Sequence, residues 1–281
     1  MARVSAELPD GPLAALREGR AALLITPGAD GFPAVAFTWA VALDASTVRF
    51  GADHGSSALA NLERAGRASL QVVADQPFLV KGPTAPVRAS IEAARRLGIA
   101  LWEMLVTGVR DQSWPGARVH PLAYEWAPEQ RAQMLALEQA VFAEMREAAR
   151  PPLSGTVVTG QGRGSAFTAV PWARERLRAL LGDDPWPGTL NLRIDDPASL
   201  ARWKALAARP GSRLSSPGGG ACDARAYAAL VGALPVLIVV PEVPGYPENQ
   251  VELVAGRPLR SQLGLADGDS VAVHTAERPA P

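Results

Sequence analysis

Three short motifs in the second half of the chain contain residues whose types and spacing could carry out chemistry. The first is a glycine-rich run of Gly160, Gln161, Gly162, Arg163, Gly164 and Ser165. Glycine backbone can approach a phosphate closely because no Cβ intervenes, and its N–H groups can converge on an anion. Residues 166–169 read as a strand and no lysine follows the glycines, so the run is neither a dinucleotide fingerprint nor a P-loop. The alternative is a plain hairpin turn.

The second motif places a hydroxyl and an amide two residues apart at the start of a predicted strand. Thr189 and Asn191 follow a stiff turn with two prolines and a glycine, and they fall on the same face of that strand. Their oxygens are hard ligands suited to Mg²⁺, with nucleotide phosphates completing the coordination shell. The alternative is a capped turn in which both side chains satisfy backbone groups.

The third motif is the run Tyr246-Pro247-Glu248-Asn249-Gln250-Val251-Glu252, which ends with a carboxylate on a predicted strand. Glu252 falls opposite the apolar side that contains Val251 and Leu253. In a cleft, this carboxylate could accept a hydrogen bond from a substrate hydroxyl or a ring N–H. The alternative is an ordinary exposed strand residue. The strand is followed by the run Arg257, Pro258, Leu259 and Arg260.

The charge balance limits the classes of partner and of phosphate site. The chain has 281 residues with 28 basic and 28 acidic side chains, and only Lys81 and Lys204 are lysines. A formal net charge of zero gives no electrostatic reason to expect nucleic acid or an anionic membrane as a partner. A phosphate site must therefore use arginine, backbone N–H groups, hydroxyls or a metal ion.

Cysteine usage and targeting signals favour a cytoplasmic protein. Cys222 is the only cysteine, which excludes an internal disulfide, and the three histidines lack the spacing of zinc ligands. The N-terminus has no apolar signal-peptide core, and the longest apolar stretch, at 228–240, is too short to span a bilayer. We expect a soluble protein without a membrane partner.

The elements that must position these motifs are mostly short strands. In the first half, strands are predicted at 21–26, 34–43, 47–50, 67–73 and 119–126, with a helix ending near Gly66. Apolar residues at helical spacing also predict a helix from Ser90 to Val106. Many strands with few helices favour a barrel over a sheet of βαβ units.

A helix predicted at 128–150 separates this half from a second strand-rich half. Pro128 suits the first helical turn, and the pair Pro151-Pro152 ends the helix. The apolar stripe of this helix could pack against one barrel or form a dimer contact. We predict a first domain at 1–127, a connecting helix at 128–150 and a second domain at 151–281. The second domain has predicted helices at 171–182 and after the Asp196-Pro197 cap.

Taken together and in this order, the motifs of the second half resemble those of the archaeal-type, CTP-dependent riboflavin kinases. The resemblance covers about 153–275 and rests on four blocks, which are 155–164, 186–191, 251–255 and 259–269. It implies a small cradle-loop β-barrel that transfers the γ-phosphate of CTP to the 5′-hydroxyl of riboflavin, giving FMN and CDP. Phosphoryl transfer depends mainly on in-line positioning and charge neutralisation, so it needs no conspicuous base.

The resemblance also implies roles for individual residues. Thr189 and Asn191 would hold Mg²⁺, with Asn191 and Glu252 as the catalytic pair, and Glu252 would contact the flavin. The runs 160–165 and 257–260 would contact CTP. The family usually has a flavin-contacting threonine eight residues before the glutamate, and in this chain that position is Pro244.

The first half is similar to the FMN-binding split barrels of the pyridoxamine-phosphate-oxidase-like superfamily. The similarity runs over about 13–126 and rests on 31–35, 56–62 and 67–73. It implies a homodimer with FMN at the interface, contacted through Ser56 and Ser57. Ala58 stands roughly where the family has a cation for the FMN phosphate.

The combined interpretation is a mainly β protein with helices (α+β), in which a CTP-dependent riboflavin kinase barrel is fused to a split flavin barrel. One alternative is an FMN-dependent oxidoreductase of the split-barrel class whose second domain only binds flavin. Another is a non-enzymatic flavin-binding module. A metal site has no use in a pure binder, so the Thr189/Asn191 pair weighs against the last alternative.

Overall fold

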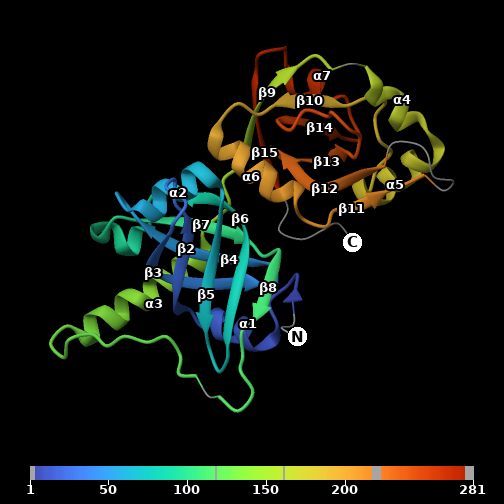
Figure 1. The fold of residues 1–281 in the computed structure, drawn as a ribbon. Coiled ribbons are helices and arrows are strands. Elements are labelled where there is room, and N and C mark those ends of the chain that lie inside the picture. Colours follow the sequence, from blue (N-terminus) through green and yellow to red (C-terminus); the bar gives the residue numbers. More distant parts are fainter. Residues whose placement is uncertain (1–3, 118, 161, 217–222, 276–281) are drawn as a thin grey trace. The chain divides into compact units, whose positions relative to one another are not determined.

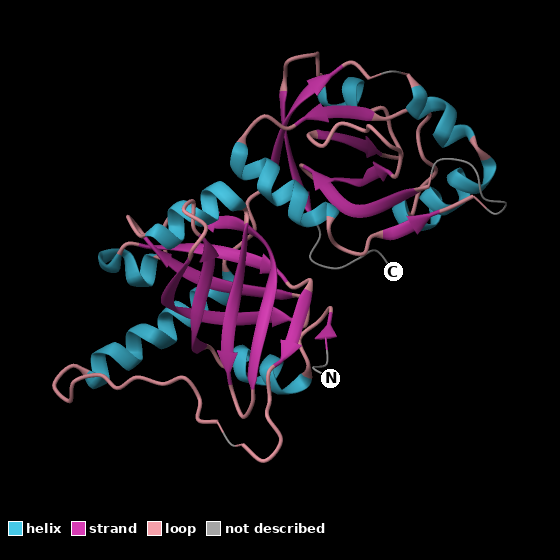
Figure 2. Ribbon diagram, in the orientation of Figure 1, coloured by secondary structure: helices cyan, strands magenta, loops and turns pink. Residues whose placement is uncertain are grey.

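The computed structural model describes residues 4–117, 119–160, 162–216 and 223–275, and the chain divides into two compact units, Met1–Arg150 and Pro151–Pro281 (Figure 1). Each unit is mainly β with a few helices, as the sequence predicts (Figure 2). In the described part of the chain, no helix is both long enough and apolar enough to cross a membrane.

The strands of the first unit form one antiparallel sheet that closes on itself. Their order is β1-β8-β6-β5-β2-β3-β4-β7, and a further β6–β7 pairing joins six of them into a barrel. Their bounds are β1 Val4–Ser5, β2 Arg20–Pro27, β3 Pro33–Asp44, β4 Thr47–Asp53, β5 Arg67–Val73, β6 Pro77–Arg88, β7 Ile99–Leu105 and β8 Gly108–Asp111.

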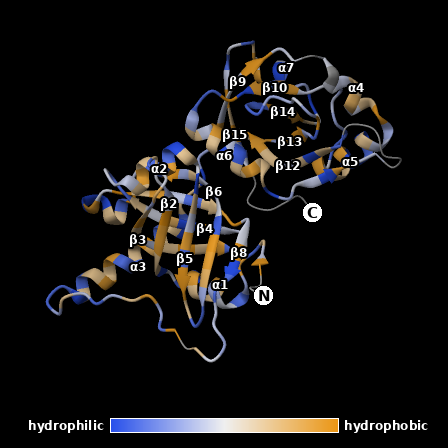
Figure 3. Ribbon diagram, in the orientation of Figure 1, coloured by the Kyte–Doolittle hydropathy of each residue, from blue (hydrophilic) through white to orange (hydrophobic). Residues whose placement is uncertain are grey.

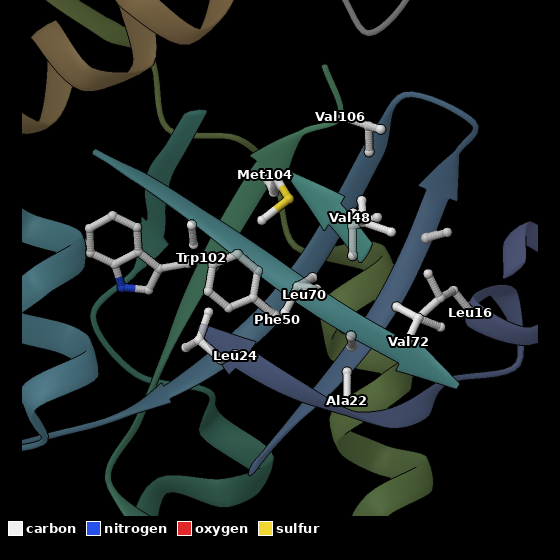
Figure 4. Packing of buried hydrophobic residues seen from close by; sticks show 14 of the residues in the cluster. Leu16, Ala22, Leu24, Val48, Phe50, Leu70, Val72, Trp102, Met104 and Val106 are labelled. Carbon is white, nitrogen blue, oxygen red and sulfur yellow. The ribbon is translucent and has the colours of Figure 1, made fainter. Parts of the chain in front are cut away.

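Alternation along the strands sends one set of side chains into this barrel. Leu24, Phe50, Leu70, Trp102 and Met104 lie together inside it and are almost completely buried (Figure 4). In Figure 3 the strands carry most of the hydrophobic colour, whereas the helices mix hydrophobic and hydrophilic residues. Burial of apolar surface inside the barrel is thus the main driving force for folding of this unit.

The helices of the first unit cover the barrel from outside. They are α1 Asp10–Arg17, α2 Ser57–Ala65, the 3₁₀ helix η1 Glu92–Leu97 and α3 Arg131–Glu147. The predicted connecting helix is α3, and it buries Val141, Phe142 and Met145 against Val41 and Leu101 of the first barrel. Of the two roles considered for its apolar stripe, packing against one barrel is therefore the one that the structure shows.

Two elements predicted in the first half are wrong. The helix at 90–106 is only the short η1, which Gly98 ends in the left-handed region at φ 64°, followed by strand β7. Almost every side chain of β7 is buried, so its apolar residues mimic a helical face. The strand at 119–126 is irregular chain, because Pro121 cannot donate to a ladder and Tyr124 and Trp126 are held by side-chain hydrogen bonds instead.

A buried ion-pair cluster ties the end of α3 and the residues after it to the barrel wall. Arg49 on β4 is 1% exposed, and its Nε lies 3.2 Å from Oε2 of Glu103 on β7. The Arg49 guanidinium also donates to the carbonyl of Met145 on α3 at 2.6 Å. Arg150 completes the cluster, with its Nε 2.8 Å from Oε1 of Glu103.

Replacing Glu103 with glutamine is expected to lower the free energy of unfolding of the first barrel by about 3 kcal/mol. The substitution leaves the buried guanidinium of Arg49 without the carboxylate charge that offsets its desolvation. Urea denaturation followed by tryptophan fluorescence would measure the change. The control is Glu92→Gln, which removes the exposed pair with Arg95 and should cost less than about 1 kcal/mol. Equal costs for the two variants would contradict the expectation.

The second unit forms a second closed antiparallel barrel. Its sheet order is β11-β12-β13-β14-β10-β9-β15, and a β12–β15 pairing joins six strands into a ring. The bounds are β9 Leu153–Val158, β10 Leu190–Arg193, β11 Ser212–Leu214, β12 Ala224–Val231, β13 Leu234–Pro241, β14 Gln250–Val254 and β15 Ser270–Thr275. The core contains Leu192, Trp203, Ile238, Val251 and Val271.

The helices of the second unit are α4 Arg163–Ala169, α5 Pro171–Leu181, α6 Pro197–Ala207 and α7 Leu259–Leu263. Asp196 caps α6 by accepting from the backbone N–H of Ser199, as its sequence position predicts. The predicted strand at 166–169 is wrong, because it belongs to helix α4. There the Thr168 hydroxyl donates to the carbonyl of Gly164, so this β-branched residue is satisfied within a helix.

Candidate functional site

The three motifs of the second half meet at one cavity of about 850 Å³ in the second barrel. Strand β10 pairs with β9 on one side and with β14 on the other, which places Asn191 opposite both Val158 and Glu252. Directly opposed residues on neighbouring strands face the same side of a sheet. The cavity is lined by residues from every motif, among them Gly160, Gly164, Ser165, Thr189, Asn191 and Glu252.

The glycine run packs directly against the Thr189/Asn191 pair. A Cβ on Gly160 would lie 2.2 Å from Nδ2 of Asn191, and one on Gly164 would lie 2.4 Å from Oγ1 of Thr189. Both distances are well inside van der Waals contact, so neither position has room for a side chain. Glycine here permits a close approach of backbone to the two polar side chains. Gln161 lies outside the described residues, and Arg163 begins helix α4.

A neighbouring amide fixes the orientation of Asn191, which is 8% exposed. The Nε2 of Gln250 donates to Oδ1 of Asn191 at 2.9 Å, and Nδ2 of Asn191 lies 3.5 Å from Oγ1 of Thr189. An amide oxygen has two lone pairs, so Oδ1 keeps one acceptor position after it binds Gln250. The sequence places Gln250 in the third motif but indicates no role for it, although it precedes Glu252 by two residues on β14 and therefore shares its face.

The polar oxygens of this pair fit a divalent cation that arrives with a ligand. Thr189 and Asn191 supply neutral hard oxygens, and the described residues contain no cluster of three or more His, Cys, Asp or Glu side chains that could hold a metal. Two neutral ligands are too few for an octahedral ion such as Mg²⁺, which keeps several waters and takes further oxygens from phosphates. Binding of Mg²⁺ by this pair stays a prediction, and the two oxygens would need phosphates and waters to complete the coordination shell.

Glu252 is half-buried beside Asn191, across the β10–β14 pairing, and lines the same cavity. Its Oε1 accepts a hydrogen bond of 2.9 Å from the hydroxyl of Tyr246, which also lines the cavity. Pro244 also lines the cavity, and its side chain offers no hydrogen bond. The sequence singles out Glu252 and Pro244. It includes Tyr246 in the third motif without a role, because a loop residue six positions away has no periodic relation to a strand.

The run 257–260 is divided between two cavities. Arg260 lines the main cavity and donates to the carbonyl of Val158 at 3.0 Å and to Oδ1 of Asp267 at 2.7 Å. Arg257, Pro258 and Leu259 line a smaller cavity of about 180 Å³, which Arg260 also reaches. Gly188 and Thr189 line both cavities, so the two cavities adjoin each other at the second motif.

A carboxylate holds Arg260 at the edge of the main cavity. The Thr159 hydroxyl donates to Asp267, and that hydrogen bond and the one from Arg260 keep the pKa of the Asp267 carboxyl below its ordinary value of 3.8. The carboxylate is therefore ionised throughout the neutral range, and it would lose this partnership only as the pH falls through its lowered pKa. A fixed arginine suits a phosphate ligand.

In the first barrel, the two serines predicted to contact flavin lie at the start of α2. The Ser56 hydroxyl accepts from the backbone N–H of Leu59 and donates to the carbonyl of Asp53, so it serves as the helix cap. Ser57 is the first helical residue and is exposed, and Ala58 is buried. These residues supply no cation for a flavin phosphate, and FMN binding by this barrel stays a prediction.

The second unit is similar to a known protein family. A family model whose description reads "CTP-dep_RFKase: Domain of unknown function DUF120" matches residues 157–275. A riboflavin kinase of Methanoculleus marisnigri is 38% identical over 126 residues, which are 43% of this chain and 55% of that protein. One of Saccharolobus solfataricus is 32% identical over 127 residues, or 43% of this chain and 71% of that protein. The chain thus spans about half the length of the Methanoculleus relative.

Solved structures are similar to this chain at low sequence identity. A putative pyridoxamine 5′-phosphate oxidase from Lactobacillus delbrueckii is 19% identical at a TM-score of 0.32 and covers 37% of this chain and 94% of its own. A heme binding protein from Mycobacterium smegmatis is 14% identical at a TM-score of 0.30 and covers 88% of each chain. At these scores the similarity carries no argument about function.

Proposed function

The chain belongs, through residues 157–275, to the CTP-dependent riboflavin kinase family, and we propose that its second barrel phosphorylates riboflavin at the expense of CTP. The observation that carries the proposal is the cavity in which a glycine run, a hydroxyl–amide pair and a carboxylate meet. Its volume of about 850 Å³ is within the range of sites that hold drug-sized ligands (about 300–1,000 Å³), and flavin and nucleotide would enter it together.

In the proposed reaction, each motif has a separate task. The glycine run and Arg260 bind the phosphates of CTP, while Thr189 and Asn191 hold Mg²⁺, which would neutralise charge on the transferred phosphoryl group. Glu252 accepts a hydrogen bond from riboflavin and fixes its orientation. A bond forms between the 5′-oxygen of riboflavin and the γ-phosphorus, and the bond to the β–γ bridging oxygen breaks. The electron pair of that bond leaves with CDP, and the hydroxyl proton is released to solvent.

The test is direct. The full chain is incubated with riboflavin and Mg²⁺, with CTP in one sample and ATP in another, and the flavins are separated by chromatography. The proposal expects FMN with CTP and little or none with ATP. FMN in equal amounts with both nucleotides would contradict the CTP preference. No FMN with either nucleotide would overturn the kinase assignment.

Substituting Gln250 with alanine is expected to raise the Mg²⁺ concentration needed for half-maximal FMN formation by about tenfold, the effect of one lost hydrogen bond. Without Nε2 of Gln250, the Asn191 amide can rotate and present its NH₂ group to the cation. The rate at saturating Mg²⁺ should fall much less. Gln262→Ala, in the exposed helix α7, is the control. A lower maximal rate with an unchanged Mg²⁺ requirement would contradict this role.

We also propose that the chain forms a homodimer through the first barrel. Strand β3 and the turn before it expose Phe32, Val35 and Phe37, which are 74, 57 and 62% accessible. Val35 and Phe37 are two residues apart on β3 and share a face of the sheet, and Phe32 lies in the turn next to them. Exposed apolar residues grouped in this way are typical of an interface. Sedimentation equilibrium of the full chain would test this, with a dimer at micromolar concentrations as the expected result and a monomer as the contrary one.

A further inference from the structure

The first barrel has a cavity of its own, of about 400 Å³, for which the proposed kinase chemistry has no use. Four of its lining residues are aromatic, namely Phe37, Trp39, Tyr124 and Trp126. Phe37 and Trp39 come from β3. Tyr124 and Trp126 come from the irregular segment that precedes α3. A volume of this size suits a small organic molecule.

The polar atoms of the large rings are engaged with one another and with a buried carboxylate. The indole N–H of Trp39 donates to the hydroxyl of Tyr124, and that hydroxyl donates to Oε1 of Glu138. The indole N–H of Trp126 donates to the same oxygen at 2.9 Å, and Glu138 is only 9% exposed. The network fixes the rings, so what they offer a ligand is aromatic carbon surface.

Two of the rings are in edge-to-face contact with each other and form a corner. The centroids of Tyr124 and Trp126 are 5.1 Å apart and their planes are inclined at 78°. Burial, followed by the hydrogen bond to Glu138, raises the pKa of the Tyr124 hydroxyl, so this ring stays neutral and keeps its hydrogen bond in the physiological range. Two walls at nearly a right angle can contact a rounded group from two sides.

The charged residues at this cavity are acidic. Asp53 and Glu125 line it, and Glu138 lies directly behind two of its rings. Among the described residues that line the cavity there is no lysine, arginine or histidine. A phosphate group would therefore meet carboxylates and find no cation here, whereas a positive charge would be attracted by the carboxylates and by the negative faces of the rings.

We propose that this cavity binds a small organic cation with an apolar body, of the quaternary ammonium class. A quaternary ammonium carries its charge on methyl groups, so it can contact ring faces without losing hydrogen bonds to water. The carboxylates of Asp53 and Glu125 lie where they can compensate the charge at the rim. This site does not depend on the kinase assignment of the second barrel.

Calorimetric titration of the full chain with two probes of nearly the same shape tests the proposal. One probe is (4-hydroxyphenyl)trimethylammonium, and the other is 4-tert-butylphenol, in which a carbon replaces the charged nitrogen. We expect the cation to bind at least tenfold more tightly. Equal affinity would reduce the cavity to a hydrophobic pocket and overturn the proposal, as would no binding of the cation.

Variants of the acidic lining residues test whether the cation binds in this cavity. Glu125→Gln and Asp53→Asn should each weaken the cation several-fold and leave the neutral probe unchanged, because only the charge at the rim is removed. Glu129→Gln, an exposed carboxylate four residues from Glu125 that does not line the cavity, is the control and should change neither affinity. FMN is titrated in parallel. Displacement of the cation by FMN at comparable concentrations would contradict the proposal and favour a flavin phosphate in this cavity.

Discussion

Replacing Asn191 with alanine is expected to reduce FMN formation by at least about a hundredfold, the size of effect seen when one preorganised electrostatic contact to a reacting group is lost. The variant loses Oδ1, one of the two protein oxygens proposed to hold Mg²⁺, and leaves only the hydroxyl of Thr189. It also leaves the amide of Gln250 without its acceptor. Initial rates of FMN formation at saturating CTP and at increasing Mg²⁺ would measure the loss.

The matched control is Asn249→Ala, which removes the same side chain from a position beside the cavity that does not line it. Only the backbone carbonyl of Asn249 is used, as acceptor for the N–H of Ile194, and alanine keeps that carbonyl. This variant should be as active as the parent chain. Asn191→Ala with unchanged activity would remove the metal-ligand role of Asn191 and, with it, the proposed assignment of the motif.

The second large effect is expected from adding one methyl group to the glycine run. In Gly160→Ala, the new Cβ would have to be accommodated 2.2 Å from Nδ2 of Asn191, so either the run or the amide must move. A misplacement of about 1 Å in a reacting constellation can cost about a hundredfold in rate. We expect a loss of this order in kcat, measured by FMN formation, with little change in the midpoint of thermal unfolding.

Gly256→Ala is the control for crowding alone. Its Cβ would lie 2.5 Å from Oδ2 of Asp183, which is slightly farther than the contact at Gly160 and involves the end of an exposed side chain that can move aside. Activity close to that of the parent chain is expected. If Gly160→Ala and Gly256→Ala retained equal activity, the close contact between the glycine run and Asn191 would have no importance for turnover.

Local signals in the sequence were sufficient for those elements whose ends are set by neighbouring residues. The cap at Asp196, the proline that follows it and the glycine after Leu181 predict the bounds of α6 and α5, because a cap acts within one helical turn. The sequence likewise predicts that the second half is rich in strands. The mainly β architecture follows from these elements together.

Elements set by distant contacts could not be predicted in this way. The apolar residues of 99–105 look helical in isolation, and only pairing with β4 and β6 makes them a strand buried on both faces. Residues 166–169 have strand-forming side chains, yet they form the end of α4. In both cases tertiary packing overrode a local preference.

The candidate site likewise combines residues that the sequence identifies with contacts that only the folded structure provides. The types and spacing of Thr189, Asn191 and Glu252 identified them as candidates without any coordinates. Their meeting at one cavity depends on the register in which Asn191 opposes Glu252, and register is not contained in either strand alone. The sequence indicates no role for Gln250 and Tyr246, because their importance comes only from the groups they contact.

Closure of the barrels has a consequence for behaviour in concentrated solution. Within the described residues, the strands at the ends of the two sheets are β1, with two residues, and β11, with three. Unpaired edges of this length present too few free N–H and C=O groups to serve as templates for intermolecular strand addition. The folded protein is therefore protected against edge-to-edge aggregation, and loss of the β6–β7 or β12–β15 pairing would be the event that exposes an aggregation-prone surface.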